Sequence, residues 1–159
     1  MMIQNLADFM RIGLNFGGEL ISISKELAHV QAYVNIMNYR FSHKICFTSD
    51  IPKELLSYEI LKIILQPLVE NCIVHGFENF EYVGVISITG TKRDGYIYLT
   101  VSDNGRGGDV DKMNRLLNKE FSPDEPIEKY GIHNINQRIH LYFGNEYGLS
   151  YKKNIPHGL

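Results

Sequence analysis

The sequence predicts a single domain of the α+β class, because strand patterns in the middle of the chain are flanked by helical patterns. An apolar helical stripe precedes the strands, two adjacent strand patterns share a short turn, and a second helical stripe follows them. A chain of 159 residues can bury a sizeable core but is short for two domains. We therefore expect helices and strands to share one core.

Two helical patterns open the chain. Residues 2–14 have apolar side chains at helical spacing, and this pattern stops at Gly17 and Gly18. A second helix is expected to begin near Ser22, which is a suitable N-cap residue. Its apolar stripe comprises Leu27, Val30, Val34, Met37 and Phe41. The spacing of this stripe predicts that one face of the second helix packs against the core.

The next segment has one strand pattern and one long helical pattern. Residues 44–50 are expected to form a short strand, and residues 55–76 a third helix. Pro67 lies inside that helix and has no backbone N–H to donate, so we expect a kink or a restart there.

A β-hairpin is predicted after the third helix. Strand patterns cover residues 83–89 and 96–103, and the connection between them contains Asp94-Gly95. This dipeptide is a strong signal for a tight hairpin turn, because both positions tolerate a positive φ.

The last third of the chain contains a long polar segment and a helix. Residues 109–129 predict a mobile loop with a short helix, and loops of this length are usually functional. A fourth helix is expected over residues 132–143, and another strand is expected to start at residues 148–151. One helical face has apolar side chains at Ile132, Ile135, Ile139 and Tyr142.

Composition excludes several classes of partner. A net charge of −2 offers no basic surface for nucleic acid or anionic lipid. The two cysteines, Cys46 and Cys72, are far apart and lack metal-ligand spacing, which favours a reduced, cytoplasmic setting. No apolar stretch is long enough to span a bilayer, so we expect any membrane anchor to lie outside this chain.

Asp103 is the first candidate functional residue. Strand alternation places it on the same face as Ile97, Leu99 and Val101, where a carboxylate is costly unless something satisfies it. The glycines after Asp103 allow the backbone to approach a ligand closely. The alternative is a surface turn, since Asp-Asn-Gly is also a common hairpin signal.

Asn71 and Gly131 are further candidates. Asn71 lies among apolar helical residues, so its amide must be hydrogen-bonded or must face a cleft. An amide oxygen suits Mg²⁺ when phosphates supply other ligands, but a structural hydrogen bond is the alternative. Gly131 begins a helix, where unpaired backbone N–H groups can bind an anion.

Three motifs resemble those of a known family. Residues 65–76, Leu-Gln-Pro-Leu-Val-Glu-Asn-Cys-Ile-Val-His-Gly, resemble the N box of sensor histidine kinases of the LytS/YesM type. Residues 103–107 resemble their first glycine box, and residues 131–139 resemble their second. Residues 26–41 also resemble the helix that precedes the ATP-binding domain in that family.

The resemblance implies a Bergerat-type ATP-binding fold, which is a two-layer α/β sandwich with a mixed sheet covered by helices. In this interpretation residues 1–42 form a helical segment at the end of the dimerisation and acceptor element. Residues 43–159 form the ATP-binding domain, without its last strand. The family belongs to the superfamily of gyrase, chaperone, histidine kinase and MutL ATPases.

The resemblance also implies which residues would bind the adenine base of ATP and the Mg²⁺ ion. Asn71 would coordinate Mg²⁺, and Asp103 would accept a hydrogen bond from the adenine amino group of ATP. Gly105 and Gly107 would form the turn and the hinge of a lid that comprises residues 109–129.

Other residues are implied at the phosphates. Gly131 and the amides that follow it, including those of Ile132 and Asn134, would bind the phosphate groups. Glu70 would orient or assist the phosphoryl acceptor, and His75 would line the phosphate side. The acceptor histidine would lie outside this chain, in a parent kinase that is a membrane-anchored homodimer and signals to a response regulator.

Two positions depart from the family pattern. Val74 stands where the family usually has a lysine that contacts the phosphates, and Lys129 stands where the second box commonly has its first glycine. Lys129 would restrict the lid or would supply the charge that Val74 lacks.

Two alternatives stay open, and these departures support the first of them. One is a module of the same fold that binds nucleotide poorly and acts by pairing with another subunit. The other is an ATPase of the gyrase, chaperone or anti-sigma type, although the N box with Pro67 favours a histidine kinase. A dinucleotide-binding fold is disfavoured, because no Gly-x-Gly-x-x-Gly opens a helix after the first strand.

Overall fold

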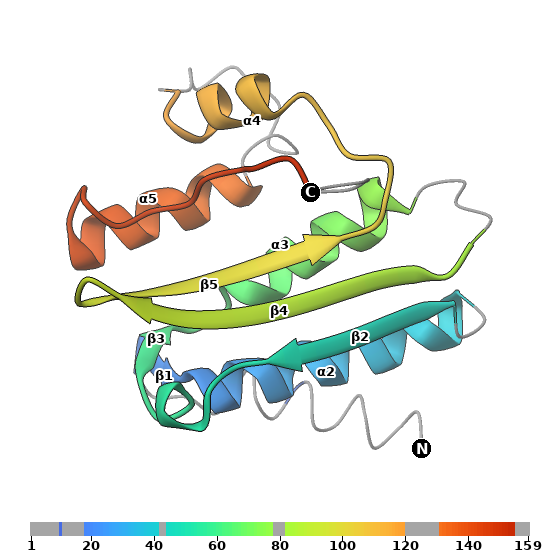
Figure 1. The fold of residues 1–159 in the computed structure, drawn as a ribbon, viewed down its shortest axis with the longest axis horizontal. Coiled ribbons are helices and arrows are strands. Elements are labelled where there is room, and N and C mark those ends of the chain that lie inside the picture. The colour runs from blue at the N-terminus through green and yellow to red at the C-terminus, as the bar shows by residue number, and fades with distance from the viewer. Residues whose placement is uncertain (1–9, 11–17, 42–43, 78–81, 120–130, 155–159) are drawn as a thin grey trace.

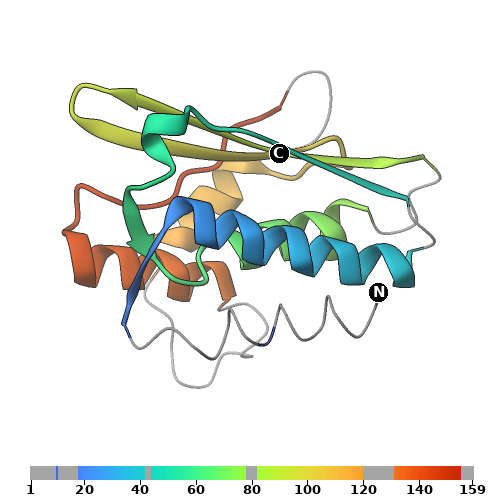
Figure 2. The ribbon, with the colours of Figure 1, turned by 90° about the horizontal axis from the view of Figure 1, so that it is seen from below.

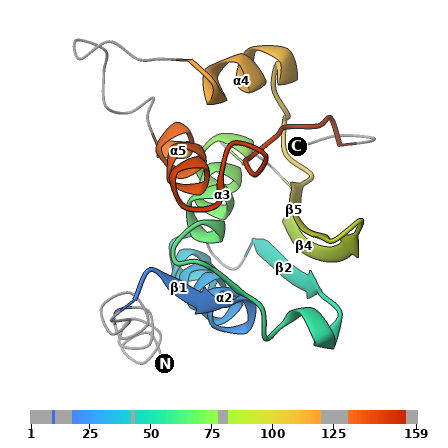
Figure 3. The ribbon, with the colours of Figure 1, turned by 90° about the vertical axis from the view of Figure 1, so that its left-hand side faces the viewer.

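The computed structural model describes residues 10, 18–41, 44–77, 82–119 and 131–154. These residues form two layers, with helices on one face of a sheet (Figure 3). The helical layer contains α2 (Ile23–Arg40), α3 (Leu65–Asn71) and α5 (Gly131–Phe143), and the sheet contains β2 (Ile45–Asp50), β4 (Gly84–Arg93) and β5 (Tyr96–Asp103). The predicted two-layer α+β class with a mixed sheet is therefore confirmed.

The sheet has the order β2-β4-β5 among the described strands (Figure 1). Strand β2 runs parallel to β4, and β4 runs antiparallel to β5. The predicted Asp94-Gly95 hairpin is confirmed, since both residues have positive φ angles of 53° and 83° and the strands pair up to Arg93 and Tyr96. Strand β4 is longer than predicted, because it continues to the hairpin.

The main core lies between the sheet and helices α2 and α3 (Figure 2). Val30 and Val34 of α2 are buried against Ile86 and Ile88 of β4, which are fully buried themselves. Ser22 caps α2, since its hydroxyl accepts a hydrogen bond from the N–H of Lys25 at 3.3 Å. The predicted apolar stripe and its N-cap are confirmed.

The predicted division at residue 42 stays a prediction. Helix α2 precedes that division and β2 follows it, yet Val34 and Ile45 belong to the same core. In this structure α2 is therefore an integral part of the two-layer fold.

The predicted long helix over residues 55–76 is wrong. This segment starts with the end of a short 3₁₀ helix, η1 (Lys53–Leu55), and strand β3 (Glu59–Leu61), and only then enters α3. Strand β3 pairs antiparallel with β1 (Leu20–Ser22), a partner that local periodicity does not reveal. The predicted restart at Pro67 is confirmed, because this proline lies in the first turn of α3, where no intrahelical partner is needed.

Glu26 holds the start of α3. Its side chain is fully buried, and its carboxylate accepts hydrogen bonds from the N–H groups of Ile63, Ile64 and Leu65 at 2.9, 2.8 and 2.9 Å. Ile63 has a φ of 57°, which is unfavourable for a β-branched residue. The negative charge of Glu26 also interacts favourably with the positive end of the α3 helix dipole. Glu26 therefore compensates both the strain and the unpaired amides at this helix start.

A short helix, α4 (Val110–Leu117), follows β5, as the sequence predicts within residues 109–129. Asp109 caps this helix by accepting a hydrogen bond from the N–H of Lys112 at 3.0 Å. Residues 120–129 of that predicted loop lie outside the described residues.

The strand predicted at residues 148–151 is absent, because this segment bonds to asparagine side chains in place of a neighbouring strand. The N–H of Leu149 donates to Asn136 Oδ1 at 2.7 Å, and the N–H of Tyr151 donates to Asn114 Oδ1 at 2.7 Å. The segment is therefore extended beside α4 and α5 without joining the sheet.

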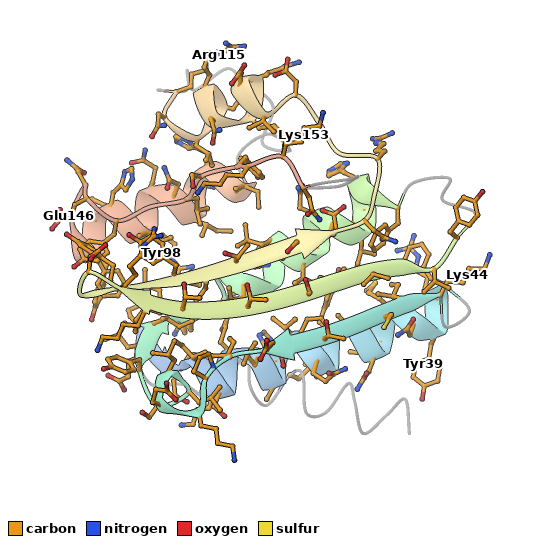
Figure 4. The ribbon with its side chains drawn as sticks, in the orientation of Figure 1. Tyr39, Lys44, Tyr98, Arg115, Glu146 and Lys153 are labelled. Atoms are coloured by element: carbon orange, nitrogen blue, oxygen red, sulfur yellow. The ribbon has the colours of Figure 1, made fainter. Side chains whose placement is uncertain are left out.

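Helix α5 confirms the predicted helix over residues 132–143. Ile135 and Ile139 are buried with Leu61 in a second, smaller core. The sequence also predicts Tyr142 on this face, but its side chain is 50% exposed, and its ring centroid lies 5.0 Å from that of Phe143. The same end of the molecule carries Tyr98 and Glu146 (Figure 4).

Most of the first predicted helix, residues 1–9 and 11–14, lies outside the described residues. No helix in the described part of the chain is long and apolar enough to cross a lipid bilayer.

We predict that Glu26→Ala destabilises the fold by about 3 kcal/mol, because it leaves buried backbone amides at the start of α3 without an acceptor. Urea denaturation followed by circular dichroism measures the change. Glu54→Ala is the matched control, since Glu54 is exposed in η1. Equal unfolding free energies for the two variants would contradict the assigned role of Glu26.

We predict that protonation of His29 destabilises the fold. His29 is 2% exposed on α2, and burial lowers its pKa below 6.5 while the charge of Glu26 opposes this shift. The folded state therefore binds this proton more weakly than the unfolded state does, so stability is lost as the pH falls below about 6.5. His29→Gln should make the unfolding free energy less dependent on pH between about 7.5 and about 5. If the unfolding free energy of His29→Gln depends on pH as steeply as that of the wild type, His29 is not the destabilising group.

Candidate functional site

Two cavities lie next to each other at the C-terminal end of α3, and Asn71 lines both. The first has a volume of about 350 Å³ and lies between α3, β5 and the segment 148–154. Among its lining residues are Cys72, Asp103, Tyr151, Lys153 and Asn154. Volumes of a few hundred Å³ are typical of small-molecule sites.

The second cavity has a volume of about 410 Å³ and lies between α3, α4 and the start of α5. The sequence-predicted residues Glu70, His75, Gly131 and Ile132 all line it. The structure therefore brings most of the predicted site residues to two adjoining cavities, although they come from three separate segments of the chain.

The helix that carries Asn71 changes its winding at this point. Helix α3 ends at Asn71 and continues as one π-helical turn, η2 (Cys72–Gly76). Single π-turns are rare and frequently mark functional sites. Asn71 is half-buried, whereas Glu70 and His75 are exposed to the second cavity. At the π-turn, the helix therefore has a buried face toward the first cavity and an exposed face toward the second cavity.

Asp103 is buried, with only 4% of its surface exposed. Its Oδ1 accepts a hydrogen bond from the N–H of Gly105 at 2.7 Å, and its backbone oxygen accepts one from Asn154 Nδ2 at 2.8 Å. The chain after Asp103 leads into α4 and not into a paired strand. The hairpin alternative for Asp-Asn-Gly is therefore wrong, and the carboxylate belongs to the first cavity.

The glycines after Asp103 have two different roles. A Cβ at Gly105 would lie 2.5 Å from the backbone oxygen of Gly76 and 2.7 Å from Asp103 Oδ1, so only glycine fits there. The N–H of Arg106 donates to the same Gly76 oxygen at 3.1 Å. Gly107 has a φ of 67°, which favours glycine. Close packing explains Gly105, whereas backbone conformation explains Gly107.

Burial and charge alter the acidities of groups in the first cavity. Burial raises the pKa of the Cys72 thiol well above its usual range, and the nearby Asp103 carboxylate raises it further. Burial raises the pKa of Tyr151 to about 12. Both side chains are therefore protonated donors at neutral pH.

Positive charge is distributed unevenly between the cavities. The described residues around the second cavity include two histidines, His75 and His133, but no lysine or arginine. Val74 lines this cavity and is 50% exposed, so the residue that replaces the expected lysine is on its surface. The first cavity has Lys152 and Lys153, which both belong to the segment 148–154 (Figure 4 labels Lys153).

Three predicted site residues line neither cavity: Asn134 is exposed on α5, and Gly105 and Gly107 lie in the loop after β5. Lys129 lies outside the described residues, so its predicted role stays a prediction. Sequence reasoning missed Cys72 and Tyr151. The sequence around Cys72 indicates an ordinary core residue next to Asn71. For Tyr151 the sequence predicts only a position in a strand, with no signal for a role in the site.

The described residues contain no group of three histidine, cysteine, aspartate or glutamate side chains that could hold a metal ion. Asn71 offers one amide oxygen where the cavities meet. A metal ion here needs most of its ligands from a bound phosphate and water, which is the mode that Mg²⁺ commonly uses.

Two family models match the chain. Residues 57–155 match the model described as histidine kinase-, DNA gyrase B-, and HSP90-like ATPase. Residues 1–45 match a histidine kinase model.

Relatives and a solved structure agree with these matches. The sensor protein LytS of Oceanobacillus iheyensis is 36% identical over 144 residues, which cover 89% of this chain and 24% of that protein. The sensor histidine kinase YesM of Bacillus subtilis is 35% identical over 148 residues, 93% of this chain and 24% of that protein. The chain thus spans about a quarter of these relatives.

The catalytic domain of histidine kinase ThkA has a similar fold, with a TM-score of 0.53 and 19% identity over 76% of this chain and 77% of that domain. This chain therefore belongs to the histidine kinase-, DNA gyrase B- and HSP90-like ATPase family, and it is an ATP-binding domain of the sensor histidine kinase type.

Proposed function

We propose that this domain binds ATP with Mg²⁺ across both cavities and transfers the γ-phosphate to a histidine outside the chain. The position of Asn71 carries this proposal, because its half-buried amide lines both cavities. A nucleotide with its base in the first cavity and its phosphates in the second would contact the Asn71 side chain. The matched ATPase family supports the choice of ligand.

The base would bind at Asp103. A buried carboxylate accepts hydrogen bonds but cannot donate them while ionised, so it selects a base with an amino group. Adenine has an amino group at position 6, whereas guanine has a carbonyl oxygen there. Asp103 therefore supplies a chemical reason for a preference for ATP.

The phosphates would bind at the second cavity. Gly131 lies at the start of α5, where backbone N–H groups have no intrahelical acceptor. Ile132 would provide the next amide, and His75, which lines the same cavity, would provide a side-chain donor. Asn71 would bind Mg²⁺ through its amide oxygen, with phosphate oxygens and water as the other ligands.

Phosphoryl transfer depends mainly on positioning and on charge stabilisation, so a site with few reactive side chains can support it. Glu70 is exposed at the second cavity and would orient the acceptor histidine or take its proton. We further propose that residues 109–129 act as a lid hinged at Gly107, and that Lys129 adds charge to the phosphates.

The proposed physiological context follows the relatives. The sensor histidine kinase YesM is about four times as long as the matched region, which covers 24% of it. We propose that the parent protein is a membrane-anchored homodimer, that this domain is cytoplasmic, and that a response regulator receives the phosphoryl group.

A second candidate is a module of this fold that binds ATP weakly and acts through another subunit. The exposed Val74 supports it, because the described lining of the second cavity has no lysine or arginine. The affinity for ATP and its dependence on Mg²⁺ discriminate between the two candidates.

We predict that the 159-residue chain binds ATP with micromolar affinity when Mg²⁺ is present, and that Asn71→Asp reduces this affinity at least about tenfold. Aspartate keeps the size of the side chain but adds a negative charge next to the phosphates. Calorimetric titration with and without Mg²⁺ measures both effects. Asn145→Asp is the control, since Asn145 is exposed and lines neither cavity. Equal affinities for both variants would place Mg²⁺ elsewhere.

We predict that Asp103→Asn weakens ATP binding and reduces the preference for ATP over GTP, because an amide can also donate to the guanine carbonyl. Competition titrations give the ratio of the two dissociation constants. Asp50→Asn serves as the control, since Asp50 is exposed at the end of β2 and lines neither cavity. If the ratio of the GTP and ATP dissociation constants stays at the wild-type value, Asp103 does not recognise the base.

A further inference from the structure

Tyr151 shares one property with Asn71. Among the described residues, these are the two that line both cavities. Asn71 is the last residue of α3, whereas Tyr151 belongs to the segment 148–154, so the two side chains come from different walls of the site. The junction of the cavities is therefore formed by an amide and a phenol, and the proposed function uses only the amide.

The backbone of Tyr151 is held at both of its polar groups. Asn114 of α4 accepts a hydrogen bond from the Tyr151 N–H at 2.7 Å and donates one to the Tyr151 carbonyl oxygen at 3.0 Å. The buried Asn136 of α5 accepts a hydrogen bond from the backbone N–H two residues earlier, at 2.7 Å. Three residues later, Asn154 Nδ2 donates to the backbone oxygen of Asp103 at 2.8 Å. Contacts with α4, α5 and β5 thus fix the point from which the Tyr151 side chain extends.

The hydroxyl of Tyr151 has no acceptor in the described part of the chain. The residue is half-buried, and its hydrogen bonds with described residues involve only its backbone N–H and carbonyl oxygen. A phenol has one O–H donor and keeps its proton at neutral pH. Burial strengthens this property, since it raises the pKa of Tyr151 to about 12. A fixed, neutral hydrogen-bond donor therefore lies where the two cavities meet.

The second cavity requires neutral donors for a phosphate chain. Its described lining contains no lysine or arginine, although the phosphate groups of a nucleotide are anionic. Hydrogen bonds to a charged acceptor are roughly twice as strong as those between neutral groups. In a nucleotide the α-phosphate directly follows the ribose. With the base in the first cavity and the other phosphates in the second, the α-phosphate lies at the junction that Tyr151 lines.

We propose that Tyr151 is a nucleotide-binding residue whose hydroxyl donates a hydrogen bond to the α-phosphate. This inference rests on the proposed function, which places the base at Asp103 and the phosphates at the second cavity. The α-phosphate keeps its bonds while the γ-phosphate is transferred. The contact with Tyr151 is therefore the same before and after transfer, and it contributes to affinity without changing the rate of the chemical step.

The test compares Tyr151→Phe with the wild type in the 159-residue chain. Phenylalanine keeps the ring and removes only the hydroxyl, which has no partner among the described residues, so we expect the fold to be kept. Tyr147→Phe is the matched control, because Tyr147 is exposed and lines neither cavity. The ligands are adenosine, AMP and ATP with Mg²⁺. Calorimetry gives the three dissociation constants, and thermal unfolding checks the fold.

We expect Tyr151→Phe to raise the dissociation constants of AMP and ATP by the same factor of about ten, which corresponds to the loss of one hydrogen bond to a charged group. The dissociation constant of adenosine should stay at the wild-type value, and Tyr147→Phe should change none of the three. Equal weakening of adenosine, weakening of ATP without AMP, or three unchanged affinities would each overturn the inference. A wild-type chain that binds none of the ligands would refute the proposed function itself, and the inference with it.

Discussion

The buried contact between Glu26 and the start of α3 is the constraint on which the rest of the structure depends. Helix α3 carries Asn71 at its other end, so the place where it begins determines where the two cavities meet. Ile63 enters the helix with a positive φ, and three backbone amides there bond to one carboxylate from α2. A charge buried in one helix thereby sets the position of the functional end of another.

Asparagine side chains position the loops in a similar way, by hydrogen bonds from a side chain to the backbone of another segment. Asn38 bonds to both backbone groups of Ile45, at 2.8 and 2.9 Å, and so connects α2 to β2. Asn104, Asn114 and Asn136 likewise each bond to the backbone of another segment. Each amide has a donor and an acceptor, so it can replace a rung of a β-ladder where strands do not pair. Irregular segments around the cavities thus gain defined positions.

The site itself divides its chemistry between a buried side and an exposed side. Asp103 and Cys72 lie in the buried part, where a hydrogen bond is strong and selective. Glu70, His75 and Gly131 lie at the open cavity, where a second macromolecule could reach a bound phosphate. Such a division suits an enzyme whose acceptor comes from outside the domain, since base recognition and phosphoryl transfer make opposite demands on solvent access.

The sequence by itself determined the α+β class, the Ser22 cap, the Asp94-Gly95 hairpin and the motifs around Asn71 and Asp103, because each depends on local periodicity, turn chemistry or short spacing. The tertiary structure alone decided the rest. Strand β3 and the buried charge of Glu26 join residues about 40 positions apart. Local patterns carry no information on such contacts, since the identity of the partner appears only when the chain is folded.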